Sequence, residues 1–179
     1  MTPRIPPGRL RRLGPVNWTV WRVVSLVSRT PDAQLFSTLG RAGGTYRGWL
    51  HFAATVLMPG GRISRHETEL VIIRVAHLRG CDYEMDHHIR LSRRAGVTPE
   101  ILARALIGSE ADGWSDRHRA MLAAVDELIT GKDLSDTAWA ALSRHLNDRG
   151  MIEFVLLVGQ YDMLATTITT LRIDRDTFH

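Results

Sequence analysis

Residues 66–101 read HETELVIIRVAHLRGCDYEMDHHIRLSRRAGVTPEI, and this stretch decides the fold because two helical patterns are joined by one glycine. Just before it, residues 64–67 (SRHE) have the form of a capping box, so we expect a helix that runs to about residue 79. Gly80 separates this helix from a second one over about residues 82–95, which Gly96 ends. The spacing therefore predicts a helical hairpin in the middle of the chain.

The rest of the chain also has helical spacing between turn residues. Thr98 is a good N-cap for a helix to about residue 107, and Ser115 and Ser135 are good N-caps for helices to about residues 129 and 146. Further helical patterns cover residues 17–28, 32–41, 48–58 and about 148–171. Strand alternation and internal repeats are not evident. We predict an all-α bundle of about seven to nine helices, in one domain over residues 1–179.

Composition and charge restrict the partners of the protein. The chain has 23 basic and 19 acidic residues, and its arginines are scattered rather than massed, so nucleic acid is not an expected partner. The most apolar segment, residues 154–171, is interrupted by Gln160 and Asp162, so no membrane span is expected. A single cysteine cannot form an internal disulfide, which favours a cytoplasmic location. Four prolines predict an extended arm over residues 1–15, suited to lie over a neighbouring subunit.

Four residues of the hairpin form the candidate catalytic site. Cys81, Glu84 and His88 stand at i, i+3 and i+7, so they share one face of the second helix. Glu69 lies on the apolar stripe of the first helix, where a carboxylate is costly unless it is paired. Cys81 opens its helix, whose positive end stabilises a thiolate. The alternatives are a small buried hydrophobe for Cys81 and a structural ion pair for Glu69.

Three further residues are candidates for substrate binding. Arg62 and Arg65 could hold a substrate carboxylate, and Tyr161 interrupts the apolar final helix and could reach the pocket. A core tyrosine is the alternative for Tyr161. Cysteine, histidine and two carboxylates could also ligate zinc, but a second soft ligand is lacking nearby. We therefore expect neither a metal nor a cofactor.

At these residues the chain resembles the carboxymuconolactone decarboxylase family, which includes the alkylhydroperoxidase D-type (AhpD-like) proteins. The resemblance is specific over about residues 64–107 and continues loosely through the C-terminal helices. In the peroxidase branch a glutamate precedes a Cys-x-x-Cys pair, and a histidine follows four residues later. Glu69, Cys81 and His88 fall on three of those positions. Glu84 replaces the second cysteine, so the disulfide cycle of that branch cannot run.

The resemblance implies an AhpD-like helical bundle that assembles into homo-oligomers, as a dimer, trimer or hexamer, with pockets near subunit contacts. It also implies a small-molecule substrate. The lactone decarboxylase branch relies on acid–base groups in a helical pocket rather than on a cysteine pair. The sequence thus combines the carboxylate and histidine of the family with one thiol.

Three functions follow as hypotheses. The first is a lyase-like acid–base enzyme for decarboxylation or isomerisation of a small organic acid or lactone, in which Glu69 transfers the proton, His88 is its partner and Glu84 tunes it. The second is a one-cysteine alkylhydroperoxidase, a peroxiredoxin-type antioxidant or redox sensor, that uses Cys81. The third is a helix-turn-helix over residues 89–106, which is disfavoured because Glu100 would face phosphates.

Overall fold

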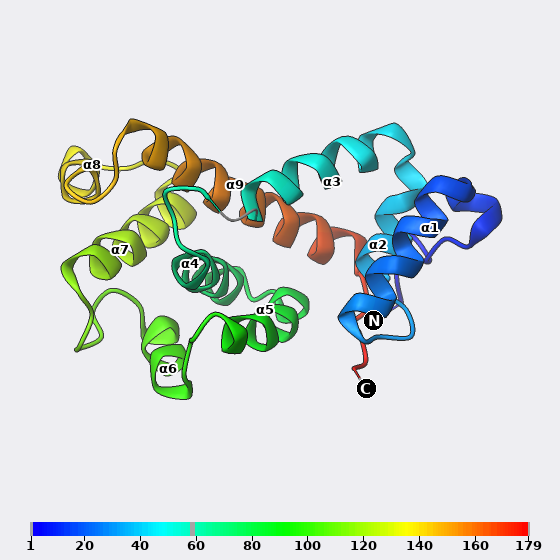
Figure 1. Cartoon of the computed structure of the whole chain (residues 1–179), viewed down its shortest axis with the longest axis horizontal. Helices are drawn as coiled ribbons and strands as arrows, with labels where there is room; N and C mark the ends of the chain where they lie inside the picture. Colours follow the sequence, from blue (N-terminus) through cyan, green and yellow to red (C-terminus); the bar gives the residue numbers. More distant parts are fainter. Residues whose placement is uncertain (1, 58–59, 179) are drawn as a thin grey trace. The chain divides into compact units, whose positions relative to one another are not determined.

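The computed structural model describes residues 2–57 and 60–178, and within them it contains nine α-helices, one short 3₁₀ helix and no strand (Figure 1). The elements are, in order, α1 (Leu10–Ser28), α2 (Gln34–Leu39), η1 (Gly40–Ala42), α3 (Gly44–Leu57), α4 (Arg65–Leu78), α5 (Asp82–Arg94), α6 (Pro99–Ile107), α7 (Asp116–Gly131), α8 (Asp136–Ser143) and α9 (Asp148–Leu171). The prediction of an all-α fold is confirmed. The residue at which the predicted third helix ends, Met58, lies outside the described residues.

Helix caps account for most of the boundaries. Ser64, Thr98, Ser115 and Ser135 each accept a hydrogen bond from the backbone N–H three residues on, as the sequence predicts. Helix α8 ends at Ser143, earlier than the predicted end at about residue 146. Asn147 then caps the start of α9, where its side-chain oxygen accepts a hydrogen bond from the N–H of Gly150 at 3.0 Å.

The prediction of an extended arm over residues 1–15 is wrong in its second half. Helix α1 begins at Leu10, and its first turn is followed by a break at Gly14, whose φ of 71° only glycine adopts freely. Pro15 directly follows this break and opens the longer part of the helix, where its missing N–H costs nothing. Residues 2–9 precede the helix, and Arg4 N–H donates to the carbonyl of Leu171 at 3.0 Å.

The chain divides into two compact units, Met1–Thr55 with Thr167–His179, and Val56–Thr166. In the first unit, α1 packs against α2 and η1 around Leu13, Trp21 and Ala33. The indole N–H of Trp21 donates to Asp32 at 2.9 Å, which joins α1 to the turn before α2. The catalytic candidates all belong to the second unit, which is therefore the one that matters for the site.

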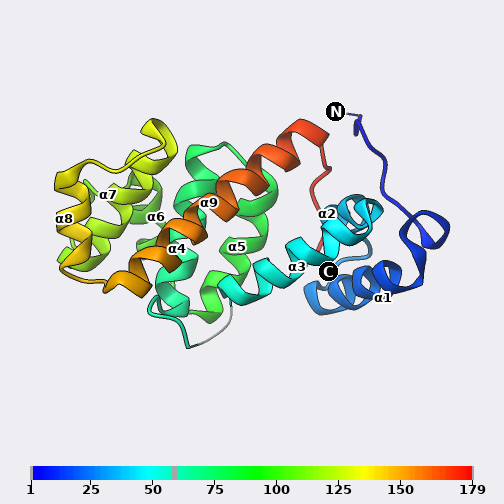
Figure 2. The same ribbon diagram turned by 90° about the horizontal axis from the view of Figure 1, so that it is seen from above.

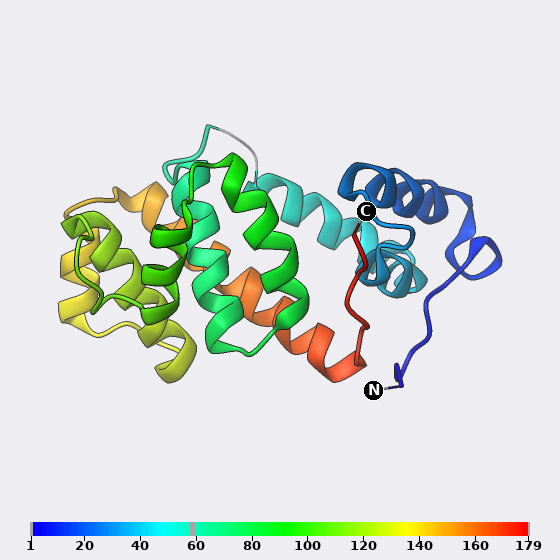
Figure 3. The same cartoon turned by 90° about the horizontal axis from the view of Figure 1, so that it is seen from below.

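Helix α4 is the centre of the second unit. It packs against α5, α6 and α7, and every residue from 67 to 76 is buried. The helical spacing predicts that Glu67 and Arg74 lie on a more solvent-exposed face of this helix, and this prediction is wrong. Glu67 accepts from Arg117 at 2.5 Å, and Arg74 donates to Asp126 at 2.6 Å, so each buried charge has a partner from α7. Figure 3 shows α4 and α5 running antiparallel beside each other.

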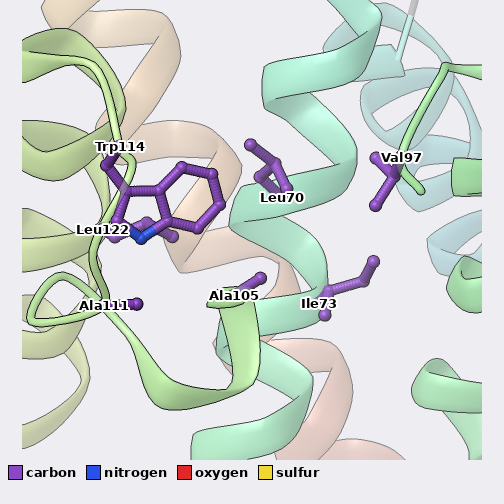
Figure 4. Packing of buried hydrophobic residues seen from close by; sticks show 7 residues of the cluster. All are labelled: Leu70, Ile73, Val97, Ala105, Ala111, Trp114 and Leu122. Carbon is purple, nitrogen blue, oxygen red and sulfur yellow. The ribbon is translucent and has the colours of Figure 1, made fainter. Parts of the chain in front are cut away.

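One apolar cluster joins α4 to α6, to α7 and to the loops next to them. Leu70 and Ile73 of α4 point toward Trp114 and Leu122 on one side and Val97 on the other (Figure 4). The indole N–H of Trp114 donates to the carbonyl of Gly108 at 3.0 Å, so this large ring is buried without losing its hydrogen bond. The contacts of this cluster hold α4, the helix that carries Glu69, against its neighbours.

Helix α9 supplies the remaining side of the second unit. It is the one helix among the described residues that is long and apolar enough to cross a membrane, but half of its apolar window is buried, as in a core helix. In Figure 2 it runs obliquely past α4 and α5. Arg79, the C-cap of α4, forms an ion pair with Asp162 at 3.1 Å and donates to Thr166 at 2.7 Å. These bonds place the middle of α9 against the α4–α5 hairpin.

The capping box of α4 should contribute measurably to stability. The Ser64 hydroxyl accepts from Glu67 N–H at 3.2 Å, and the Glu67 carboxylate accepts from Ser64 N–H at 2.8 Å. We expect Ser64→Ala to lower the free energy of unfolding by about 1 kcal/mol in urea denaturation. Ser143→Ala is the matched control, since this exposed hydroxyl caps no helix. It should change stability by less than about 0.5 kcal/mol. Equal effects of the two changes would contradict the assignment.

Candidate active site

The turn between α4 and α5 brings the candidate catalytic residues together. Gly80 adopts a φ of 58°, and the N–H of Cys81 donates to the carbonyl of Ala76 at 2.9 Å, so the chain reverses within a few residues. Because α5 then runs antiparallel to α4, His88 in the second turn of α5 faces Glu69 in α4. The tight turn is thus what allows the two helices to share one buried polar site.

The centre of the site is an imidazole between two carboxylates. His88 Nδ1 lies 2.8 Å from Glu69 Oε2, and His88 Nε2 lies 3.3 Å from Glu84 Oε2. All three side chains are buried, and Glu69 is 0% exposed. Both ring nitrogens are therefore engaged by acceptors, an arrangement that suits a doubly protonated imidazolium.

Arg65 adds a second positive charge. It stands one helical turn before Glu69 on α4, and its guanidinium forms an ion pair with Glu69 Oε1. The Arg65 side chain is 42% exposed, whereas its partner is fully buried. Glu69 thus uses one oxygen for Arg65 and the other for His88, and Arg65 connects the buried site to the surface.

Tyr161 closes the site from α9. Its ring lies edge-on to the imidazole of His88, with ring centroids 5.1 Å apart and an angle of 89° between the planes. Burial, together with the charges of Glu84 and Glu69, raises the pKa of Tyr161 well above its ordinary value. The phenol is therefore neutral, and it lies among the site residues as the sequence predicts. Whether it contacts substrate stays a prediction.

Cys81 lies at the start of the same helix, as its N-cap residue, and is 2% exposed. Burial raises the pKa of the thiol, and the negative charge of Glu84 raises it further. The backbone N–H groups of Tyr83 and Glu84 lower it, but the result is a pKa of about 11. The helix N-terminus alone does not produce a thiolate here, contrary to the expectation from sequence. The resting group is a thiol that sits beside a carboxylate.

The charge of His88 follows from the same contacts. Burial alone would lower its pKa, but the hydrogen bonds to Glu69 and Glu84 and the charges of both carboxylates outweigh burial and raise the pKa to about 9. At neutral pH the centre of the site is therefore an imidazolium between two carboxylates. It holds a proton that either carboxylate can receive.

Not every candidate from the sequence reaches this site. Arg62 is exposed, and its described bonds lead elsewhere. Its N–H donates to Glu153 at 2.7 Å, and its carbonyl accepts from Arg117 at 3.2 Å. The helical spacing of α5 also predicts that Leu91 lies on the same inner face as His88, but Leu91 is exposed. Tyr83 is buried instead, so the buried face of α5 is rotated toward Tyr83. The sequence contains no sign of this, because Tyr83 stands next to Asp82, on the face whose residues are mostly charged.

Within residues 2–57 and 60–178, no group of three or more His, Cys, Asp and Glu side chains is arranged to hold a metal ion. The site carboxylates are instead engaged by Arg65 and His88. Positive charge is thus already supplied to them by the chain itself.

The titration of His88 tests this geometry. We expect its imidazole NMR signals to titrate with a midpoint near the raised pKa of about 9. Glu84→Gln removes one of the two carboxylates and should lower the midpoint. The exposed Glu110→Gln is the matched control and should leave it unchanged. A midpoint near 6.5 in the unmodified protein would contradict the buried pairing.

The same shift predicts how stability depends on pH. A histidine whose pKa is raised in the folded state stabilises that state fully below its unfolded pKa of about 6.5. This contribution, on the order of 3 kcal/mol for a shift to about 9, is lost as the pH rises through that value. Urea denaturation at several pH values should therefore show stability falling between about pH 6.5 and 9. A flat profile over this window would contradict the prediction.

Comparisons with known proteins agree with this architecture. Residues 44–127 match the model of the Carboxymuconolactone decarboxylase family. The uncharacterized protein YdfG of Bacillus subtilis (strain 168) is 27% identical over 100 residues, which cover 55% of this chain and 68% of that protein.

Among solved structures, an uncharacterized peroxidase-related protein from Ralstonia eutropha JMP134, described as an alkylhydroperoxidase AhpD core, superimposes with a TM-score of 0.83 at 16% identity. The match covers 97% of this chain and 92% of that one. The debrominase Bmp8, in complex with 2,3,4-tribromopyrrole, superimposes with a TM-score of 0.79 at 15% identity, again over 97% and 92% of the two chains. The resemblance seen in the sequence agrees with both comparisons: residues 44–127 match the carboxymuconolactone decarboxylase family model, and the chain has an AhpD-like all-α fold.

Proposed function

We propose that the protein is a one-cysteine enzyme that reduces a small oxidised organic molecule, with an organic hydroperoxide as the first candidate. Cys81 would be the nucleophile, and Glu84, His88 and Glu69 would form its proton relay. The observation that carries the proposal is that both ring nitrogens of His88 are engaged by carboxylates. We call the series Glu69, His88, Glu84 and Cys81 the row. The imidazole of His88 can pass a proton along this row, but both of its nitrogens are occupied, so it cannot itself contact a substrate.

The order of groups along the row points to the Cys81 end as the reacting end. Glu69 is fully buried, with one oxygen on Arg65 and the other on His88, so it is poorly placed to meet a substrate. Glu84 contacts the imidazole through Oε2 and follows Cys81 by three residues on the same face of α5, and its charge raises the pKa of the thiol. Glu84 is thus the group that can take the Cys81 proton. The first hypothesis, with Glu69 as the direct acid or base, is supported less well.

A protonated resting thiol is compatible with this chemistry. As the thiol proton moves to Glu84, the sulfur attacks one peroxide oxygen, an S–O bond forms and the O–O bond breaks. The alkoxide leaving group takes up a proton from the relay, so Cys81 becomes a sulfenic acid and the peroxide becomes an alcohol. Two equivalents of a small thiol would then return the sulfenic acid to the thiol, releasing water and a disulfide. No second protein cysteine is needed.

The relatives support a small organic substrate of this kind. One neighbour in fold is described as peroxidase-related, and another is a debrominase that was crystallised with a brominated pyrrole. A halogenated aromatic compound is therefore the second substrate class to test with Cys81. Decarboxylation or isomerisation, with no role for the thiol, remains the alternative.

A mass-spectrometric experiment tests the thiol. The protein is mixed briefly with a near-stoichiometric organic hydroperoxide and a sulfenic-acid trap, and the adduct on the intact protein is followed with time. We expect fast adduct formation on Cys81 and none in Cys81→Ser. Glu84→Gln should slow it by roughly a hundredfold, because the thiol loses its base. The exposed Glu110→Gln is the control and should react at the rate of the unmodified protein.

The opposite result is equally informative. A thiol that stays inert toward hydroperoxide and halogenated substrates, while the unmodified protein and Cys81→Ser turn over a carboxylated lactone equally well, would reject this proposal. It would favour the acid–base hypothesis.

We also propose that the protein is a homo-oligomer, as the family resemblance implies. Ile152, Val155 and Leu156 lie at helical spacing on α9, and each is at least 39% exposed. Exposed apolar side chains on one helix face are typical of subunit contacts. Light scattering that finds a monomer at high concentration would end this proposal. A cytoplasmic location stays a prediction.

A further inference from the structure

A cleft lies between α7 and α8, in the unit of residues 56–166 that also contains the candidate active site. It has a volume of about 480 Å³, within the range of small-molecule sites. The residues from α7 stand at i, i+3, i+4 and i+7, so they form one face of that helix. The lining residues are Asp116, Arg119, Ala120, Ala123, Ala141, Arg144 and His145.

The cleft exists because its floor is made of alanine. Ala120 and Ala123 of α7 and Ala141 of α8 leave space where larger side chains would close the seam between the helices. The hairpin that carries them is held at its far end, where the N–H and the hydroxyl of Ser135 donate to Glu127 at 2.8 and 3.1 Å. The cleft therefore has an apolar part formed by these alanines, on a hairpin whose two helices are joined by hydrogen bonds.

Two arginines and one aspartate supply the charges on its lining. Arg119 comes from α7, whereas Arg144 and His145 follow the end of α8, and Asp116 is the only acid among the lining residues. One N–H of Arg119 donates to the carbonyl of Ser109 at 2.5 Å, which leaves its other donors for a ligand. Two guanidinium groups from separate helices repel each other across one cleft unless an anion lies between them. The lining thus favours an anion.

We infer that this cleft binds a small organic anion, namely a carboxylate on an apolar body. The carboxylate would lie against Arg144 and Arg119, where a guanidinium offers paired donors, and the apolar part would lie on the alanine floor. None of the lining residues belongs to the Cys81 site. The inference therefore stands or falls independently of the proposed reaction.

The test uses benzoate as the probe, followed by NMR chemical shifts of the backbone amides. Benzoate should shift signals of the lining residues and bind in the millimolar range, and neutral benzamide should bind at least about tenfold more weakly. Arg144→Gln should weaken benzoate by about tenfold. Ala123→Leu, which fills the floor, should abolish binding. Arg93→Gln, another exposed arginine near a helix C-terminus, is the matched control and should bind like the unmodified protein.

Several results would overturn the inference. Equal affinity for benzamide would show that the cleft does not select an anion. Inorganic phosphate binding as tightly as benzoate would show that the apolar part of the ligand contributes nothing. Unchanged binding in Arg144→Gln, or shifts confined to residues outside the cleft, would show that the ligand does not bind in this cleft. Arg144 is exposed, so its variant should fold even if Ala123→Leu does not.

Discussion

The site depends on one constraint: the Glu69 carboxylate is fully buried in the central helix and must be neutralised there. A lone buried carboxylate is strongly unfavourable, so α4 requires positive partners for it. His88 meets it from α5 and Arg65 meets it from the preceding turn of α4. This pairing joins α5 to α4 inside the hairpin, and the same helix carries Glu84 and begins after Cys81.

Pairing and burial together set the protonation states of the site. The two carboxylates hold a proton on His88 above its ordinary pKa, while burial and Glu84 hold a proton on Cys81. Both groups are therefore protonated at neutral pH. This differs from a site built on a resting thiolate. The AhpD-like fold is shared with a peroxidase-related protein and a debrominase, and the single thiol distinguishes the chemistry proposed here from a disulfide cycle.

The cleft between α7 and α8 follows a different principle. In the buried site Glu69 is paired with His88 and Arg65, whereas the cleft is open and carries two arginines and one aspartate beside three alanines. Packing explains both. Around α4 large side chains such as Leu70 and Trp114 fill the space, whereas three of the seven residues that line the α7–α8 cleft are alanines. A protein surface that leaves like charges around an apolar hollow is better suited to a ligand than to stability alone.

The sequence by itself determined the helices and the shared face. Capping residues such as Ser64 and Thr98, together with Gly80, mark where helices begin and end, because these signals act within one or two turns of backbone. The i, i+3, i+7 spacing likewise placed Cys81, Glu84 and His88 on one face. What only the tertiary structure decided was which charges are buried and how they are paired. Arg65 joins the site whereas Arg62 does not, and the thiol remains protonated. These outcomes depend on partners from helices distant in sequence and on burial from every side of α4, and local spacing carries no information about either.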